Sequence, residues 1–165
     1  MDEFELIRRY FDRKCAASGV VLGIGDDGAI LAPSPDMQQV QVIDTLVEGT
    51  HFLSQTDPAD IAYRAVMVNL SDIAAMGATP RWMTLALTLN EANQQWIEAF
   101  SIGLFEAADR YKVTLVGGDT TAGPGITTTI SITGEIASGA ALLRSGAMVG
   151  DGIYVTGTVG DAAGG

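Results

Sequence analysis

The chain has 165 residues, of which 47% are hydrophobic and 20 are glycine. That composition excludes a disordered chain and indicates one folded, tightly turned α/β-type domain with a sizeable core. The formal net charge of −11 argues against nonspecific binding to nucleic acid or to anionic membranes. No apolar run approaches the roughly 20 residues of a membrane helix, the charged N-terminus lacks a signal-peptide core, and Cys15 is the single cysteine. A cytoplasmic location is therefore the default expectation.

The first residues predict a helix, a Gly-rich turn between short strands, and a longer strand. Apolar residues at helical spacing indicate an amphipathic helix over 4–17. The Pro and Asp content of residues 33–38 predicts a turn. The third strand is expected to end at Asp44 or just past it. The strands predicted in this part cover residues 20–24, 28–32 and 39–47.

The next segment carries clear signals for both ends of a helix. Asp57 is suited to the N-cap position, and Pro58 to the first turn. The helix is expected to run to about Met76, with Gly77 as its C′ residue.

The second half of the chain predicts four strands and one long amphipathic helix. The helix covers residues 93–111, and its apolar face holds Trp96, Phe100, Leu104 and Ala107. Alternating Thr and Ile residues mark the longest of the strands. The predicted strands cover residues 81–89, 113–118, 126–137 and 150–156. This order of elements indicates an α/β (α+β) sandwich, with a mixed β-sheet and helices packed on one face.

Four aspartates lie in or beside Gly-rich or strand-ending turns, and they are Asp27, Asp44, Asp72 and Asp119. Three of them follow short apolar runs that read as strands, and strand ends in one sheet can bring distant residues to one edge. Four carboxylates gathered there would repel one another unless a cation held them. Oxygen ligands without a Cys or His cluster suit Mg²⁺ rather than zinc. We therefore expect a site that binds phosphate through metal, which reconciles the acidic chain with a phosphate ligand.

Asp72 gives the strongest internal indication of such a site. It continues an apolar stripe at helical spacing formed by Ile61, Ala65 and Val68. A carboxylate buried at that position is costly unless it is paired or metal-bound. The alternative to a metal ligand is a buried salt bridge to Arg64 or Arg81.

The two Gly-rich segments each have a structural and a functional reading. Glycines around Asp26 and Asp27 let the backbone turn sharply and approach a ligand, but such a sequence is commonly a tight hairpin alone. Backbone N–H groups near Gly118 and Asp119 could cradle phosphate oxygens while the carboxylate holds a cation. The alternative is a plain Gly-Gly-Asp turn.

Two further polar residues are candidates for ligand contacts. His51 is the only histidine; it is either an ordinary loop residue or a hydrogen-bond donor to substrate. Arg144 is either a surface residue or a bidentate phosphate contact. The chain contains no P-loop motif, no nucleophile elbow and no protein-kinase signature set.

Taken together, several segments resemble the thiamine-monophosphate kinase family over essentially the whole chain. They read GIGDDGA, DTLVEGTHF, DPADIAYRAVMVNLSDIAAMGATP, TLALTL, GGDTTAGP and SGAMVGDGIYVTGTVGDAAGG. The family belongs to the ATP-dependent superfamily that includes aminoimidazole ribonucleotide synthetase and selenophosphate synthetase. The resemblance implies the N-terminal domain of that fold, whose sheet pairs with its twin in a homodimer.

The resemblance also implies an activity and a set of site residues. The activity is transfer of the γ-phosphoryl group of ATP to thiamine monophosphate, with Mg²⁺ ions bridging carboxylates and phosphates. The four aspartates match the metal ligands, Gly118, Asp119 and Arg144 match nucleotide contacts, and His51 matches a substrate contact. No residue matches a general base.

The sequence departs from the family pattern in three places. Val42 and Ile43 stand where Ser or Thr hydroxyls usually precede the aspartate, so Ile43 could reach a metal only through its backbone carbonyl. Ala122 stands where arginine is common. The resemblance covers only the first domain, so we expect residues 1–150 to form an N-terminal ATP- and Mg²⁺-binding domain and residues 151–165 to begin a truncated C-terminal domain.

Two other functions stay open from the sequence. The chain could belong to another ATP-dependent member of the superfamily with a different acceptor. It could also be a non-catalytic metal-binding or dimerisation module, a reading favoured by the Val42-Ile43 change. The fragment by itself is expected to be inactive.

Overall fold

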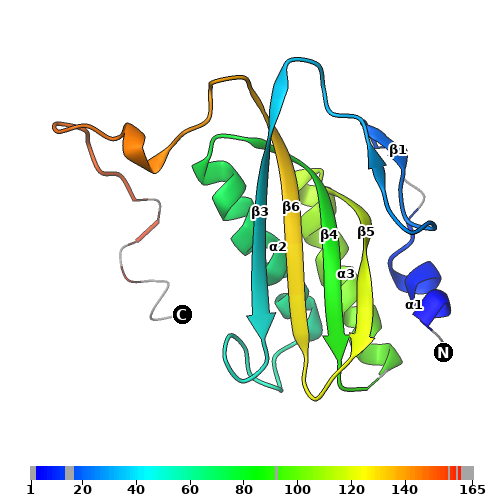
Figure 1. Ribbon diagram of the computed structural model, residues 1–165. Helices are drawn as coiled ribbons and strands as arrows, with labels where there is room; N and C mark the ends of the chain where they lie inside the picture. The colour runs from blue at the N-terminus through cyan, green and yellow to red at the C-terminus, as the bar shows by residue number, and fades with distance from the viewer. Residues whose placement is uncertain (1–2, 14–16, 92, 156, 159, 161–165) are drawn as a thin grey trace.

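The computed structural model describes residues 3–13, 17–91, 93–155, 157–158 and 160. Its centre is a four-stranded sheet in the order β3-β6-β4-β5, in which β6 runs antiparallel to both neighbours and β4 runs parallel to β5. Helices α2 and α3 cover one face of this sheet (Figure 1). The elements are α1 (Glu3–Tyr10), β1 (Val20–Leu22), β2 (Ile30–Leu31), β3 (Met37–Val47), α2 (Pro58–Ala75), β4 (Thr79–Leu89), α3 (Gln94–Tyr111), β5 (Thr114–Ala122) and β6 (Thr127–Ala137). The predicted α+β architecture is confirmed.

The capping signals read from the sequence place α2 correctly. The Asp57 side chain accepts a hydrogen bond from the Ala59 N–H at 2.9 Å at the start of α2. Asn93 caps α3 in the same way, because a side-chain oxygen satisfies N–H groups that have no partner inside the helix. At the other end of α2, Gly77 follows the C-cap with a φ of 74°, as expected of the C′ residue.

The two faces of the sheet differ in composition. Isoleucines of β6 and leucines of β4 alternate toward the helices, and Ile130 and Ile132 are fully buried there. Threonine and serine residues of β6 lie on the other face, where Thr129 and Ser131 are only partly buried. We call this second surface the open face. The period of two in the TTTISITGEIA strand therefore produces one apolar and one polar face.

A small hairpin lies beyond β5 and is separate from the main sheet. Strands β1 and β2 pair only with each other among the described strands. Their connecting segment, residues 23–29, carries Asp26 and Asp27, and we call it the glycine loop. In Figure 1 the hairpin and α1 lie on the β5 side of the sheet, whereas residues 140–155 lie on the β3 side.

Several predicted boundaries were wrong. Helix α1 ends at Tyr10 rather than at residue 17, and residues 14–16 lie outside the described residues. Strand β5 continues to Ala122, past the predicted end at residue 118. Strand β3 ends at Val47, as predicted, but begins at Met37 rather than at residue 39. No strand forms over the described residues 150–155; a single 3₁₀ turn at Arg144–Gly146 precedes an irregular segment. Its Val and Ile residues are almost fully exposed, so no neighbouring strand covers them.

None of the described helices is both long enough and apolar enough to cross a bilayer.

Candidate functional site

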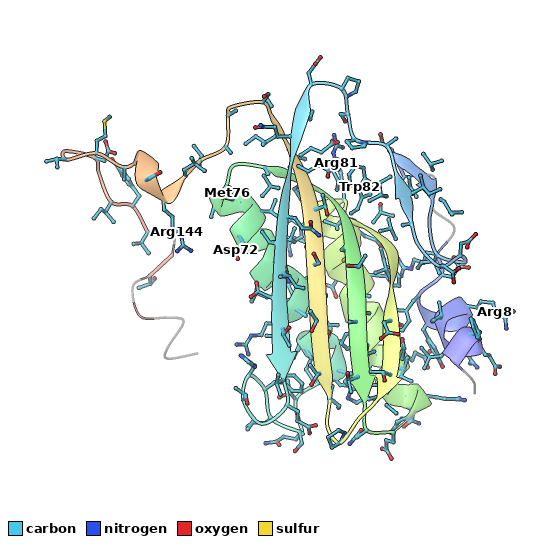
Figure 2. The ribbon with its side chains drawn as sticks, viewed as in Figure 1. Arg8, Asp72, Met76, Arg81, Trp82 and Arg144 are labelled. Carbon is cyan, nitrogen blue, oxygen red and sulfur yellow. The ribbon has the colours of Figure 1, made fainter. Side chains whose placement is uncertain are left out.

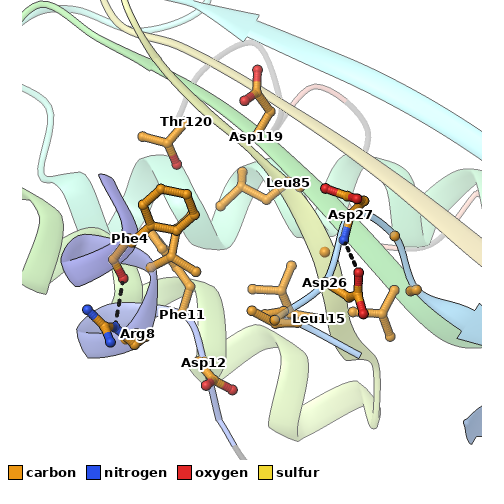
Figure 3. Close-up of a pocket in the computed structure, with 18 residues that line it drawn as sticks. Phe4, Arg8, Phe11, Asp12, Asp26, Asp27, Leu85, Leu115, Asp119 and Thr120 are labelled. Carbon is orange, nitrogen blue, oxygen red and sulfur yellow. Dashed lines mark hydrogen bonds between the residues drawn. The ribbon is translucent and has the colours of Figure 1, made fainter. Parts of the chain in front are cut away.

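A cavity of about 740 Å³ lies at the β5 edge of the sheet, between three walls. Phe4, Arg8 and Phe11 contribute the wall on the side of α1 (Figure 3). The glycine loop forms the second wall with residues 24–29. Residues 115–120 of β5, together with Leu85 of β4, form the third. We call this space the β5 cavity.

The β5 wall is shaped by an irregular strand. The register with β4 shifts between Met83 and Thr84, which leaves Val116 as an extra residue in β5. Such bulges bend a strand and re-aim its side chains, and they are common beside functional sites. Two residues later, a Cβ atom at Gly118 would overlap the backbone carbonyl of Leu85. Gly118 is therefore required by the close approach of β4, whatever its role toward a nucleotide.

Three of the acidic residues suggested by the sequence line the β5 cavity. Asp26 and Asp27 lie on the glycine loop, where the Asp27 N–H donates to Asp26 Oδ1 at 2.8 Å (Figure 3). Asp119 lies on the facing strand. Within the described part of the chain, no three His, Cys, Asp or Glu side chains come close enough to hold a metal ion between them. The expectation that four aspartates gather at one point was therefore wrong for a single chain.

Asp44 lies at the opposite edge of the sheet from Asp119. The strand register places four residues in one row across the sheet: Asp44, Ile130, Leu85 and Gly118. Three strand spacings separate Asp44 from Gly118, which amounts to about 14 Å. Asp44 shares the helix-covered face with Ile130, whereas Asp119 pairs with the exposed Ala86 on the open face. One ion cannot bridge carboxylates on opposite edges and faces. Ile43 lies beside Asp44 on the exposed strand β3, and its side chain is 67% exposed.

Asp72 is exposed, so the prediction of a buried carboxylate was wrong. Ile61 and Ala65 of the same stripe are buried, but Val68 is only partly covered. The buried stripe of α2 continues instead through Asn69 and Ile73, which are 0% and 1% exposed, so Asp72 lies beside that stripe and not on it. The alternative salt bridge was also wrong: Arg81 pairs with Glu135, and Arg64 donates to the His51 carbonyl oxygen at 2.7 Å.

His51 and Arg144 lie outside the β5 cavity. His51 is exposed in the turn after β3, where its Nδ1 accepts a hydrogen bond from the Val47 N–H at 3.0 Å. The local turn therefore fixes the imidazole ring. Arg144 is exposed in the 3₁₀ turn after β6, on the β3 side of the sheet (Figure 2). The structure thus brings Asp27, Gly118 and Asp119 together and leaves the other proposed ligand contacts elsewhere.

Sequence reasoning missed the contribution of α1 to the cavity. Phe4 is 75% exposed although it belongs to an amphipathic helix. Arg8 is the only cationic side chain among the described residues that line the cavity. The helix is held by Arg13, whose guanidinium lies 3.7 Å from the Phe105 ring centroid and pairs with Asp109 at 2.9 Å. The helical spacing assigns Phe4 to the apolar face of the helix, so its exposure is seen only in the structure.

Comparison with known proteins gives this arrangement a family. Residues 25–136, which cover most of the glycine loop and all but the last residue of the main sheet, match the family described as AIR synthase related protein, N-terminal domain. The chain belongs to this family. The matched range contains two of the three walls of the β5 cavity, which are most of the glycine-loop wall and the whole wall formed by β5 with Leu85.

Individual relatives agree with the family assignment. A thiamine-monophosphate kinase of Salmonella typhimurium (strain LT2) is 56% identical over 99% of this chain. A crystal structure of thiamine-monophosphate kinase from Stenotrophomonas maltophilia K279a has 48% identity over 99% of this chain, with a TM-score of 0.88. The structure described as AaThiL complexed with AMPPCP and TMP has 31% identity over 80% of the chain, with a TM-score of 0.59. The chain spans about half the length of the curated relatives it matches.

Proposed function

We propose that this chain is the nucleotide-binding portion of an ATP-dependent kinase that converts thiamine monophosphate to thiamine diphosphate. The observation that carries the proposal is the β5 cavity, in which two glycine-rich segments bearing carboxylates face each other. The same chain is 56% identical to a thiamine-monophosphate kinase over 99% of its length. A related structure holds AMPPCP and TMP, an ATP analogue and the acceptor expected here.

The donor set of the cavity suits magnesium. Mg²⁺ usually keeps several waters and is held by one or two carboxylates together with substrate phosphates. Asp12, Asp26, Asp27 and Asp119 line the cavity, but no three of the described acidic side chains cluster, so one or two of them would hold the ion together with the phosphates of ATP. When bound, Mg²⁺ would neutralise charge on the phosphates. The proposed metal roles of Asp44, Asp72 and the Ile43 carbonyl need a second copy or another segment to approach the β3 edge.

The chain's own residues would act mainly by positioning. Phosphoryl transfer requires the donor and acceptor to be held in line while charge is stabilised. The glycine loop and residues 117–120 border the cavity. Their backbone N–H groups that are not already used, as that of Asp27 is by Asp26 Oδ1, would donate to phosphate oxygens. Gly118 and Asp119 would contact the nucleotide directly. Arg144 and His51, which lie outside the cavity, would act on ligands that reach the β3 side.

We further propose a homodimer formed through the sheets, in the cytoplasm. Strand β3 is an edge strand of 11 residues, and it has no partner on its outer side among the described strands. Long exposed edge strands favour pairing with another chain. The open face beside it carries partly exposed Thr and Ser residues and Ile43. A second copy placed there would supply the cover that one chain lacks.

The test is an ADP-coupled assay with thiamine monophosphate as acceptor. We expect no useful turnover from the 165-residue chain alone, because the proposed metal and substrate residues lie on opposite sides of its sheet. A version joined to the second half of the Salmonella typhimurium relative should restore activity. Equal turnover by both forms would show that the active site is misplaced. Turnover only with another phosphate acceptor would identify a different superfamily member, and ATP binding without turnover in both forms would favour a non-catalytic module.

A further inference from the structure

The base of the β1–β2 hairpin is fixed to the main sheet by a buried charged network. Glu135 lies on the open face of β6 but is only 1% exposed, because residues 32–36 cross over it. Its Oε1 accepts the Ser34 N–H at 2.6 Å, and its Oε2 accepts the Ser34 hydroxyl at 2.9 Å. The Arg81 Nε donates to the same Oε2 at 2.9 Å.

A β-bulge explains how Arg81 reaches this carboxylate. The register between β4 and β6 shifts between Pro80 and Trp82, which leaves Arg81 without an opposite residue. A bulge re-aims the side chain of its extra residue. Burial raises the pKa of Glu135, but the hydrogen bonds from Ser34 and the Arg81 guanidinium outweigh it and hold the pKa below the ordinary value. The carboxylate is therefore charged and fully engaged at neutral pH.

Trp82 provides a second anchor at the other strand of the hairpin. It is 2% exposed and lies next to Arg81 at the hairpin base (Figure 2). Its indole N–H donates to the Ser18 carbonyl oxygen at 3.3 Å. A Cβ atom at Gly19 would clash with the Trp82 ring and with the Ala32 carbonyl oxygen. The tryptophan thus packs directly against the backbone where the hairpin starts.

Among the described strands, those of the hairpin pair only with each other. A two-stranded hairpin alone is marginally stable in water, and β1 and β2 form a sheet separate from β3–β6. The glycine loop at its far end forms one wall of the β5 cavity. The direction in which the hairpin leaves the main sheet therefore sets the distance between Asp27 and Asp119.

We propose that Glu135 is a positioning residue for the nucleotide site: through Ser34 and Arg81 it fixes the hairpin base and so holds the glycine loop at the β5 cavity. The inference rests on the proposed nucleotide-binding function. It predicts that a substitution in the Glu135 network, about one hairpin length from the cavity, weakens nucleotide binding. An equally destabilising substitution elsewhere in the chain should weaken nucleotide binding less.

Glu135→Gln is the variant to test, with Glu48→Gln as its matched control. Glu48 also uses a carboxylate oxygen to accept a backbone N–H, that of Ile126, at 3.0 Å, but it lies at the opposite end of the sheet. Calorimetric titration with ATP in Mg²⁺ should give a Kd about tenfold or more higher for Glu135→Gln, since small misplacements at a site are costly. Glu48→Gln should stay within about twofold of the unmodified chain. Ser34→Ala should weaken binding in the same direction, and Ser34→Thr, which keeps the hydroxyl, should restore it.

Hydrogen exchange gives a readout that does not need the nucleotide. Amide exchange across residues 19–32 should accelerate in Glu135→Gln and stay unchanged in Glu48→Gln. If the unmodified chain fails to bind ATP, the proposed function fails, and exchange in this segment still decides the positioning role. Equal Kd values for the two variants where ATP binds, or unchanged exchange over 19–32 in Glu135→Gln, would overturn the inference.

Discussion

The two edges of the main sheet differ in what surrounds them and in the regularity of their strands. At the β5 edge, α1 and the hairpin add two further walls, a bulge bends the strand, and a cavity of about 740 Å³ results. At the β3 edge the strand is regular over its 11 residues and has no described strand beyond it. Carboxylates occur at both, as Asp119 and Asp44. Similar acidic residues in a sequence can therefore belong to different surfaces: one that lines a cavity and one on an edge strand with no described strand beyond it.

The largest predicted difference is in ATP affinity, between a variant that replaces a carboxylate at the β5 edge and one that replaces a carboxylate at the β3 edge. Asp119→Asn removes a charged ligand from the cavity and should weaken ATP binding in Mg²⁺ roughly ten- to a hundredfold, the range for a lost contact to a charged group. Asp44→Asn should change the affinity of the isolated chain by less than about twofold. Titration calorimetry measures both. Equal losses would show that the two edges form one site.

The β3 side can be tested through assembly. Ile43→Arg places a charge on the exposed surface of β3, where the second copy is proposed to bind, and should raise the dimer dissociation constant at least about tenfold. Ile102→Arg is the matched control, because Ile102 is 58% exposed on α3, away from the open face. Sedimentation of the unmodified chain should show a dimer at micromolar concentration. A monomer at every concentration, or equal effects of both arginines, would contradict the proposed interface.

Mg²⁺ should raise the melting temperature of the chain, and only substitutions of carboxylates at the β5 cavity should reduce that rise. A ligand at ten times its Kd stabilises the native state by about 1.4 kcal/mol, which is roughly 3–6 °C for a chain of this size. Asp27→Asn should remove much of that increase. Asp72→Asn should keep it, since Asp72 is exposed and outside the cavity. A melting temperature that is the same with and without millimolar Mg²⁺ would count against a metal site in this chain.

The smallest predicted effect is the pH dependence of the Glu135 anchor. The folded-state pKa of Glu135 lies below its ordinary value of 4.5. Its contribution to the free energy of unfolding is therefore fully present above that pH and is lost as the pH falls through the folded-state pKa. Urea unfolding between pH 6 and pH 3 should show a steeper loss for the unmodified chain than for Glu135→Gln. Parallel profiles would show that the carboxylate titrates alike in both states.

The fold was predictable because local signals and periodicity agree in this chain. Asp57 satisfies helix N–H groups whatever the tertiary structure, and the alternation in β6 assigns its two faces. The site was only partly predictable. The glycine segments identified Asp27 and Asp119, but the strand order β3-β6-β4-β5 separates Asp44 from them, and strand order does not follow from spacing. Asp72 was misplaced because the spacing of Ile61, Ala65 and Val68 was extended to it, whereas the buried stripe of α2 runs through Asn69 and Ile73.

Glu135 was missed for a different reason. A single acidic residue in a Thr- and Ile-rich strand reads as solvent-exposed, and its partner Arg81 depends on a bulge that no local residue announces. A hydrogen-bond network between residues far apart in the chain, such as Ser34, Arg81 and Glu135, produces no regular spacing in the sequence by which it could be predicted.

The separate hairpin also makes the molecule mechanically asymmetric. An arm of roughly six residues at about 3.3 Å each is about 20 Å long, so a tilt of about 5° at its root moves its tip by about 1.7 Å. Displacements of that order change rates and affinities at phosphoryl-transfer sites. Substitutions around Arg81, Trp82 and Glu135 would therefore change the affinity of the proposed nucleotide site by tilting the hairpin, with no change in the residues that line the cavity.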